Sequence, residues 1–161
     1  MDQKRIVVVG YGGGGSKLVA ELAKKQIYKI TVITPFDYME VSLLMTKVLA
    51  VGREEHEKAI FPLVREDGVE YIIDVCVSVS NNAMTTKTGR VVPFDVCVVA
   101  VGHNIPVFFP SVTETTMQQR KDSIARVTQQ IGNARSIVIS GGGPVGAEAA
   151  ADIKLRNKNV K

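Results

Sequence analysis

The sequence predicts an α/β fold built around a parallel sheet. Short, continuous apolar runs alternate along the chain with segments whose apolar residues recur at helical spacing. A glycine-rich loop links such a run to such a segment at residues 10–15 and again at residues 141–146. Strands that alternate with helices are typical of parallel sheets covered by helices.

The first segments predict one strand–helix–strand unit. Residues 6–9 form a continuous β-branched run, which suits a strand buried on both faces, and Gly10 ends it. Apolar residues recur at helical spacing over residues 15–25, and residues 30–33 form a second short strand-like run. Together these segments predict one βαβ unit.

The middle of the chain predicts a short helix, an antiparallel meander and another strand. Residues 42–51 fit a short helix. Residues 71–79 and 90–93 fit strands around the turn at 87–89, and residues 96–101 form a further buried-strand run. We therefore expect a small antiparallel meander in this part of the chain.

A long helix and another strand are expected next. Residues 115–131 have a helical apolar pattern, which Thr115 and Gln118 open as a capping box and residues 132–133 close. Residues 137–139 fit a strand once more.

A last helix follows, with apolar residues at every fourth position from 145 to 153. A new strand pattern begins after the long helix, which places a domain boundary near Ala134. We expect a first domain at residues 1–134 and the start of a second at 135–161, which agrees with a length of 161 residues.

The composition excludes several classes of protein. With 45% hydrophobic and 22% charged residues, the chain is typical of soluble globular proteins, and it lacks an apolar run long enough to span a membrane. The net charge is +4, but Lys and Arg are scattered, so we expect no nucleic-acid partner. No cleavable signal is visible, so we expect an intracellular, by default cytoplasmic, protein; mitochondrial or membrane-peripheral association stays open.

The cysteines and histidines predict neither redox nor metal chemistry. Cys76 and Cys97 lie in separate apolar runs and form no CxxC pair, so we expect buried, reduced thiols. His56 and His103 have no cluster of metal-ligating residues beside them, so we expect no metal site.

The first glycine loop predicts a dinucleotide site. Gly10, Gly12 and Gly15 satisfy the GxGxxG pattern after a strand and at the start of a helix. The first glycine permits the tight turn, the second lets the backbone approach a pyrophosphate, and the third lets the helix pack closely. Amides at the helix N-terminus then face the anion. A tight connection without a ligand is the alternative interpretation.

The second loop repeats the pattern. Gly141, Gly143 and Gly146 stand between another expected strand and another expected helix. Both loops stand between an expected strand and an expected helix. Their repetition favours a protein with two nucleotide sites, and the alternative is two unrelated glycine turns.

Together with other motifs, the loops resemble the pyridine nucleotide-disulphide oxidoreductase superfamily, in particular its apoptosis-inducing-factor-like and ferroptosis-suppressor-like FAD-dependent NAD(P)H oxidoreductases. The further motifs are Asp37-Tyr38-Met39-Glu40, Pro93-Phe94-Asp95 with the run Val98-Val99-Ala100-Val101-Gly102-His103-Asn104, and Gly141-Gly142-Gly143-Pro144-Val145-Gly146-Ala147-Glu148 with Ile153-Lys154. The resemblance covers essentially the whole chain, but less than half of a typical member. It implies a Rossmann-like FAD-binding domain, followed by the first strand and helix of a truncated NAD(P)-binding domain.

The resemblance implies a set of cofactor positions and no catalytic residue. The first loop holds the FAD pyrophosphate, a basic residue after the second strand supports FAD, the chain passes the adenine through backbone atoms, and the second loop begins the NAD(P)H site. The implied positions are Gly10, Tyr11, Gly12, Gly13, Gly14, Gly15, Thr34, Lys47, Val75, Cys76, Gly102, Gly141, Gly143, Gly146 and Glu148.

Three positions depart from the family pattern. Thr34 replaces the acidic residue that binds ribose, Lys47 stands where Arg is usual, and Val101 replaces a Thr. A Lys lacks the planar fork of Arg, and Lys47 has the alternative of a simple solvated residue. Asp37 or Glu40 could substitute for the missing carboxylate, or both could be solvated.

The resulting hypothesis is an N-terminal part of an FAD-dependent NAD(P)H oxidoreductase. In the intact enzyme a hydride would pass from NAD(P)H to FAD and on to a quinone-like acceptor, and the part alone would be inactive. The alternative is a non-catalytic binding or structural module, with or without cofactor, in a larger assembly. A nucleotide binder that uses only the first loop is a third interpretation.

Overall fold

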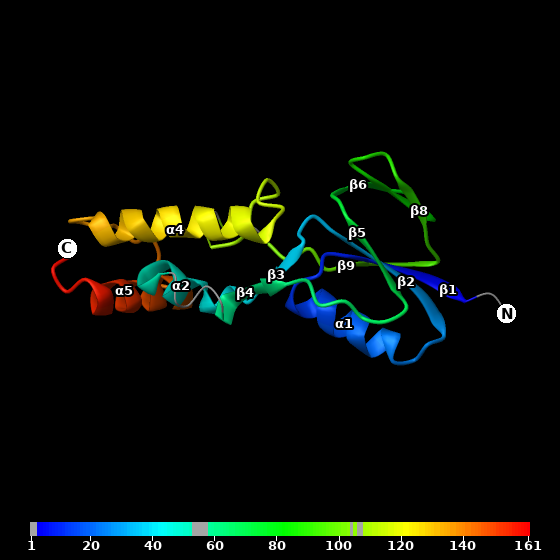
Figure 1. Cartoon of the computed structure of the whole chain (residues 1–161), viewed down its shortest axis with the longest axis horizontal. Coiled ribbons are helices and arrows are strands. Elements are labelled where there is room, and N and C mark those ends of the chain that lie inside the picture. Colours follow the sequence, from blue (N-terminus) through cyan, green and yellow to red (C-terminus); the bar gives the residue numbers. More distant parts are fainter. Residues whose placement is uncertain (1–2, 53–57, 104, 106–107) are drawn as a thin grey trace. The chain divides into compact units, whose positions relative to one another are not determined.

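A computed structural model describes residues 3–52, 58–103, 105 and 108–161 (Figure 1). The chain divides into two compact units. The first unit comprises Met1–Met39 and Pro62–His103, and the second comprises Glu40–Phe61 and Asn104–Lys161. These units are the parts of the chain that are compact in the structure, and they do not test the expected domain boundary near Ala134, which stays a prediction.

A four-stranded parallel sheet forms the centre of the first unit. Its strands are β1 (Lys4–Val9), β2 (Tyr28–Thr34), β5 (Val69–Ile73) and β9 (Val96–Val99). They lie in the order β5-β2-β1-β9, and every neighbouring pair is parallel. Helix α1 (Gly13–Ala23) connects β1 to β2. The order of connection reverses at β1, which in open α/β sheets is the point where a ligand binds beyond the carboxyl ends of the strands.

Both faces of β1 are buried, which explains its continuous apolar sequence. Ile6 and Val8 pack with Val19 of α1 on one face. Val7 and Val9 pack on the other face with Met84 and further residues of the meander. The predicted βαβ unit is therefore confirmed, with α1 on one side of the sheet (Figure 1).

The other face of the sheet is covered by the expected antiparallel meander. Its strands are β6 (Cys76–Val79), β7 (Ala83–Thr86) and β8 (Val91–Pro93). The single strand expected at residues 71–79 is wrong, because Asp74 separates β5 from β6. The Asp74 amide donates to the Thr34 carbonyl at 2.9 Å, and its carboxylate accepts from Thr88 Oγ1 at 2.6 Å.

Two short strands carry the chain between the units. They are β3 (Tyr38–Glu40) and β4 (Ile60–Pro62), and they pair as a two-stranded sheet. The family motif from Asp37 to Glu40 thus lies at this connection.

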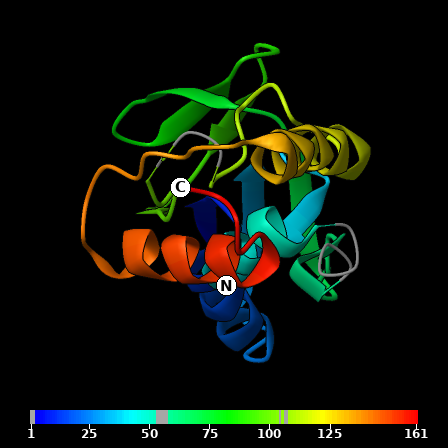
Figure 2. The same ribbon diagram turned by 90° about the vertical axis from the view of Figure 1, so that its left-hand side faces the viewer.

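The second unit is helical. It contains the 3-10 helix η1 (Ser42–Leu44) and the α-helices α2 (Met45–Val51), α4 (Met117–Asn133) and α5 (Pro144–Arg156). Helix α2 packs against both α4 and α5 (Figure 2). No helix in the described part of the chain is long and apolar enough to cross a bilayer.

Two expectations for the second unit are wrong. The capping box of α4 consists of Thr116 and Gln119, one residue later than expected. Residues 137–139 form no strand. The Ile137 N–H donates to the Lys161 carbonyl at 2.8 Å, and the Lys161 N–H donates to the Arg135 carbonyl at 3.1 Å. Val138 is 91% exposed, because no described strand pairs with this segment.

Candidate functional site

The first glycine loop is held on both sides by the sheet. Gly10 has φ +92°, and its N–H donates to the Ile33 carbonyl of β2 at 2.9 Å. On the other side the Ala100 N–H donates to the Val9 carbonyl at 2.7 Å. A Cβ on Gly10 would lie 2.7 Å from the Ala100 carbonyl carbon, so both the dihedral angle and the packing require glycine here.

Gly15 sets the distance between helix and loop. A Cβ on Gly15 would collide with the Gly10 carbonyl oxygen and would lie 3.1 Å from its carbon. The close approach of α1 to the end of β1 is therefore possible only with glycine, as expected for the third position of the pattern.

The middle of the loop presents open backbone. Cβ atoms on Gly12, Gly13 and Gly14 would meet no atom within 4 Å. Gly12 caps α1 without a side-chain hydrogen bond, and the first turn, which is fully described, carries no acidic residue. The first amides of a helix have no intrahelical partner and attract anions. This segment thus fits a pyrophosphate.

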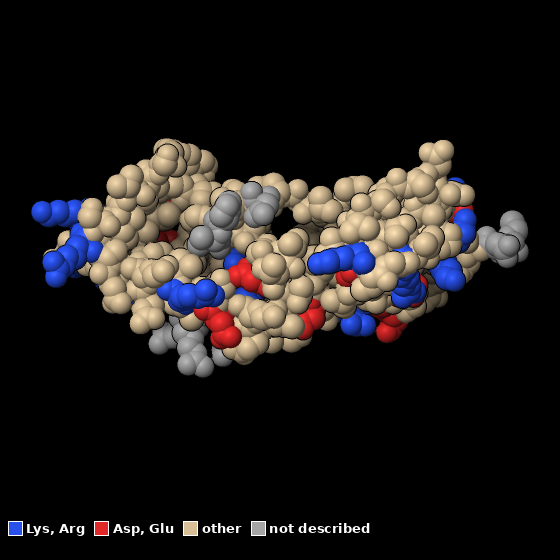
Figure 3. Space-filling view, turned by 90° about the horizontal axis from the view of Figure 1, so that it is seen from above, with Lys and Arg blue, Asp and Glu red and all other residues tan. Residues whose placement is uncertain are grey.

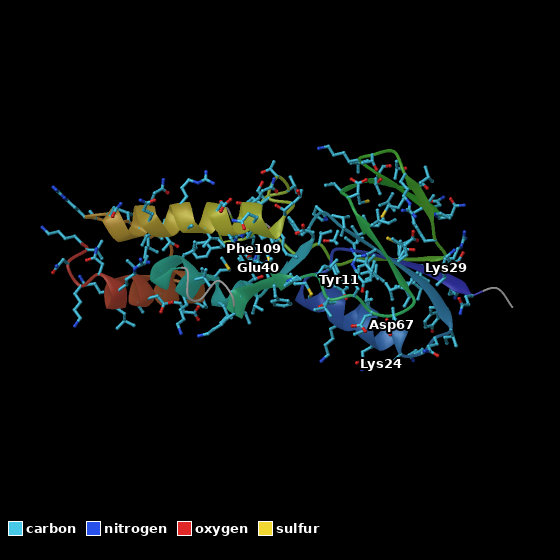
Figure 4. All side chains as sticks on the ribbon, viewed as in Figure 1. Tyr11, Lys24, Lys29, Glu40, Asp67 and Phe109 are labelled. Carbon is cyan, nitrogen blue, oxygen red and sulfur yellow. The ribbon has the colours of Figure 1, made fainter. Side chains whose placement is uncertain are left out.

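The side chain of Tyr11 points away from the open backbone of the loop and into the core. Its side chain is 5% exposed, and its hydroxyl lies 2.9 Å from the hydroxyl of Tyr71 on β5 (Figure 4). Burial, followed by the hydrogen bond with Tyr71, raises the pKa of Tyr11, so the phenol stays protonated. The backbone of Tyr11 can still line a cofactor site, but its buried ring belongs to the core.

Thr34 and Val75 lie at the same edge of the sheet as the loop. The buried Thr34 hydroxyl accepts a long hydrogen bond from the Phe36 N–H at 3.4 Å, and the Thr34 carbonyl accepts from Asp74. The Val75 N–H donates to Asp74 Oδ1 at 2.7 Å. Hydrogen bonds from Thr86 and Thr88 hold the pKa of Asp74 far below its usual range. Asp74 thus orders the strand end where the adenine contact is expected.

Gly102 follows β9 at this edge as well. It has φ +69°, and a Cβ there would meet no atom within 4 Å. Carboxyl ends of parallel strands form one edge, so the structure brings the backbone of Gly10, Thr34, Val75 and Gly102 to the same end of the sheet.

The two cysteines are free and half-buried. Both pack against the core on the meander side of the sheet, and burial raises the pKa of the Cys97 thiol. Cys76 Sγ lies 3.7 Å from the Ser78 carbonyl oxygen, to which it donates a weak hydrogen bond. The raised pKa of Cys97 favours its thiol form over a reactive thiolate.

The second loop has the same internal geometry as the first. Gly141 has φ +113°, and a Cβ on Gly146 would collide with the Gly141 carbonyl oxygen. Gly143 caps α5 without a side-chain hydrogen bond, and a Cβ there would meet no atom within 4 Å. The backbone can receive an anion in the same way as the first loop, although no strand leads into it.

Lys47 and Glu148 lie on helices of the second unit and are exposed. Lys47 is on α2, and Glu148 on α5 accepts from Thr46 Oγ1 at 3.5 Å, which is a weak contact. Their expected places among the cofactor-binding residues stay predictions.

A buried ion cluster was missed by the sequence reasoning. Arg120 of α4 is 2% exposed; its Nε donates to Glu40 Oε2 at 2.7 Å and its Nη2 to Oε1 at 3.2 Å, so the pair is bidentate. Arg120 also donates to Glu114 at 3.3 Å and to the Phe108 carbonyl at 3.3 Å. Burial raises the pKa of Glu40, and the hydrogen bond from Arg120 opposes that rise.

Glu40 is therefore neither solvated nor open to a ribose (Figure 4). The signal in the sequence was the helical spacing of Arg120 with Ile124 and Thr128, which places the arginine on the buried face of α4. A charge on such a face needs a partner.

The expectations of no metal site and no nucleic-acid partner stay predictions. The described residues contain no group of three or more His, Cys, Asp or Glu that could hold a metal ion. His56 and Asn104 lie outside the described residues. On the face in Figure 3, basic and acidic side chains are interspersed among uncharged ones.

Comparisons with known proteins agree on one family. The family model described as "Pyridine nucleotide-disulphide oxidoreductase" matches residues 4–161. Apoptosis-inducing factor 1 of Saccharomyces cerevisiae is 29% identical over 160 residues, which are 97% of this chain and 42% of that protein. This chain thus spans about two fifths of that relative's length.

Solved structures show the same fold at low identity. The water-forming NADH oxidase of Lactobacillus brevis superimposes with a TM-score of 0.72 at 16% identity, covering 94% of this chain and 37% of that one. The sulfide:quinone oxidoreductase of Aquifex aeolicus gives 0.65 at 21% identity, covering 96% and 40%. The Rossmann-like α/β fold with its parallel sheet and antiparallel meander is confirmed.

Proposed function

We propose, from the premise that this chain belongs to the pyridine nucleotide-disulphide oxidoreductase family, that its first glycine loop binds the pyrophosphate of FAD. The observation that supports the proposal most is the open, uncapped backbone of Gly12, Gly13 and Gly14 at the start of α1. It lies at the carboxyl end of β1, where the strand order reverses.

The other residues at this sheet edge would complete the FAD site. Thr34 would face the adenosine ribose in place of the usual carboxylate, and the backbone of Val75 and Cys76 would pass the adenine. Gly102 would leave room beside the loop. Lys47 is not at this sheet edge but on α2 of the second unit, and its positive charge at FAD stays a proposal from the family resemblance. A hydroxyl bonds to ribose more weakly than a carboxylate does, so the site would be weaker than one with an acidic residue.

The second loop would begin an NAD(P)H site. Gly141, Gly143 and Gly146 have the loop geometry for a second pyrophosphate, and Glu148 follows in the first turns of α5. Residues 137–139 form no strand here, so this site is incomplete in the described chain.

The whole-protein activity that fits both loops is FAD-dependent NAD(P)H oxidation. When bound, FAD would accept a hydride from NAD(P)H and pass electrons to a quinone-like acceptor. The residues of this chain would bind and orient the nucleotides and would exclude water from the loop; none is proposed as a catalytic acid or base. We expect the chain alone to bind FAD and to lack turnover.

Titration with FAD tests the proposal. The purified chain should bind FAD with one site, show the visible absorbance of bound flavin, and fail to reduce a short-chain quinone with NADH or NADPH. Absence of FAD binding would contradict the FAD site, and turnover would contradict the inactivity of the isolated chain.

One observation favours a second candidate, a non-catalytic module derived from a flavoprotein. Residue 34 is a buried Thr, so the carboxylate that binds ribose in the family pattern is lacking. Such a module would stay folded without nucleotide and would co-purify in a larger assembly. A melting temperature that FAD, NADH and ATP leave unchanged would support this candidate over the first.

A further inference from the structure

Tyr11 is the one side chain that anchors the first glycine loop in the core. It stands between Gly10 and Gly12, and glycines on both sides leave the loop with large conformational freedom. Its ring meets Tyr71 edge to face, with centroids 5.2 Å apart and planes at 87°. This arrangement is favourable for aromatic pairs.

The hydroxyl groups of the two tyrosines add a polar contact to the ring contact. They lie 2.9 Å apart, and either can donate. Tyr11 is almost fully buried, so its hydroxyl has little access to water if this bond is lost.

Tyr71 also holds a second segment, the turn that runs from Glu66 to Val69, through Glu66 and the preceding Arg65. Its hydroxyl accepts the Glu66 N–H at 3.0 Å, and the Arg65 guanidinium lies over its ring at 5.4 Å from the centroid. The latter distance is typical of a cation–π contact. The hydroxyl of Tyr71 is therefore shared between the glycine loop and the backbone of this turn.

We propose that Tyr71 is a positioning residue for the first glycine loop. It fixes the loop through Tyr11 and joins it to the turn through Arg65 and Glu66, so the loop keeps the backbone that receives an anion before the anion arrives. The role in cofactor binding rests on the proposed FAD site. Thermodynamic linkage then requires that FAD bound at the loop also stabilises the turn.

Conservative variants test the role in binding. Tyr71→Phe and Tyr11→Phe each keep the ring and remove one hydroxyl, and Tyr28→Phe at the start of β2 is the matched control. Each single variant should weaken FAD binding about three- to tenfold. The double variant should weaken it little more than Tyr71→Phe alone, because Tyr71→Phe already removes the bond that Tyr11→Phe removes. The control should bind like the wild type, and thermal melts should show all four folded.

Additive losses in the double variant, or single variants that bind FAD like the wild type, would overturn the positioning role. A structural defect alone would lower the melting temperature without this non-additive pattern in affinity.

Amide exchange tests the link without any cofactor. In the apo chain, Tyr11→Phe should accelerate exchange of the Glu66 amide about threefold or more, although the direct partner of that amide is Tyr71. The Gly52 amide, which bonds to the Val48 carbonyl in the other unit, is the internal reference and should be unchanged.

Unchanged exchange at Glu66 would overturn the link whether or not FAD binds. If the wild-type chain binds no FAD while Glu66 responds to Tyr11→Phe, the proposed FAD site is wrong and the link between loop and turn stands.

Discussion

In both glycine loops a Cβ on the third glycine would collide with the carbonyl oxygen of the first, Gly15 with Gly10 and Gly146 with Gly141. The segments that lead into the loops differ. Strand β1 lies between two parallel neighbours and is largely buried, whereas residues 137–139 pair with no described strand, and Val138 is exposed.

This difference separates local from non-local determinants. The turn and the start of the helix form in both places because glycine dihedral angles and helix N-termini are properties of a few successive residues. A strand needs partners that lie far away in the sequence. The same glycine pattern therefore gives a loop that follows a paired strand in the first unit and a loop that follows no described strand in the second.

The largest expected effect on stability comes from Arg120. The second unit depends on the packing of its helices and not on the second glycine loop. Arg120→Ala removes one partner of a buried pair and leaves Glu40 uncompensated, which should lower the free energy of unfolding by about 3–5 kcal/mol. Urea unfolding followed by circular dichroism measures it. The exposed Arg126→Ala on the same helix is the control, and equal losses in both variants would show that the buried pair is unimportant.

In the first loop, Gly15→Ala should lower the free energy of unfolding by about 2–4 kcal/mol, because hydrogen bonds from the Gly10 N–H to the Ile33 carbonyl and from the Ala100 N–H to the Val9 carbonyl restrain Gly10 against the new Cβ. Gly14→Ala, one position earlier, meets open space and should be neutral or slightly stabilising. Denaturant midpoints of the two variants compare them directly, and a Gly15→Ala variant as stable as Gly14→Ala would refute the packing argument.

The equivalent change in the second loop should cost less. Gly146→Ala meets the same collision, but a Cβ on Gly141 would find open space, so the Gly141 peptide can shift. We expect a loss of about 1 kcal/mol, within the ordinary range for single substitutions. Urea unfolding of the two alanine variants tests it, with Gly142→Ala as control. A loss as large as that of Gly15→Ala would mean that both loops are equally supported.

Acid should act on the first unit through two carboxylates. Hydrogen bonds from Arg5 lower the pKa of Asp95 to about 2, and the pKa of Asp74 is also well below its usual value. Because the unfolded chain binds these protons more readily, this stabilisation is present above about pH 4 and is lost as the pH falls toward 2. Urea midpoints between pH 5 and pH 2.5 should fall less steeply for Asp95→Asn; an unchanged slope would contradict the assignment.

Much of the first unit could be predicted from sequence because its signals are local. The β-branched run before Gly10 and the glycine spacing gave β1, α1 and the loop. The division of residues 71–79 into β5 and β6 could not be predicted, because it depends on Asp74, which bonds to Thr34 and Thr88 only in the folded sheet.

The failures in the second unit have particular physical causes. Thr115 and Thr116 each have a glutamine three residues later, so spacing alone cannot choose between two capping boxes. The apolar run at 137–139 predicted a strand, but pairing decides whether a strand forms. Arg120 stood on the apolar face of its helix, and its partner Glu40 is 80 residues away along the chain.

In the candidate site, backbone roles were easier to predict than side-chain roles. Gly10, Gly15, Gly141 and Gly146 stand where a positive φ or a close backbone contact requires glycine. Tyr11 was grouped with them as a cofactor residue, but its side chain is buried against Tyr71, a partner 60 residues away. Ring and hydroxyl contacts at such separation leave no periodic signal in the sequence.

A matched pair of aspartates tests the central claim, that the first loop receives FAD and the second does not. Gly12 and Gly143 are the N-caps of α1 and α5, both extended, where Asp is a favourable cap and should preserve stability. In each variant the new carboxylate occupies the anion position.

The measurement is the FAD dissociation constant of both variants and the wild type at constant salt. We predict that Gly12→Asp weakens FAD binding at least about tenfold, since carboxylate and pyrophosphate repel each other, and that Gly143→Asp leaves it unchanged. Wild-type affinity in Gly12→Asp, or equal losses in the two variants, would contradict the account.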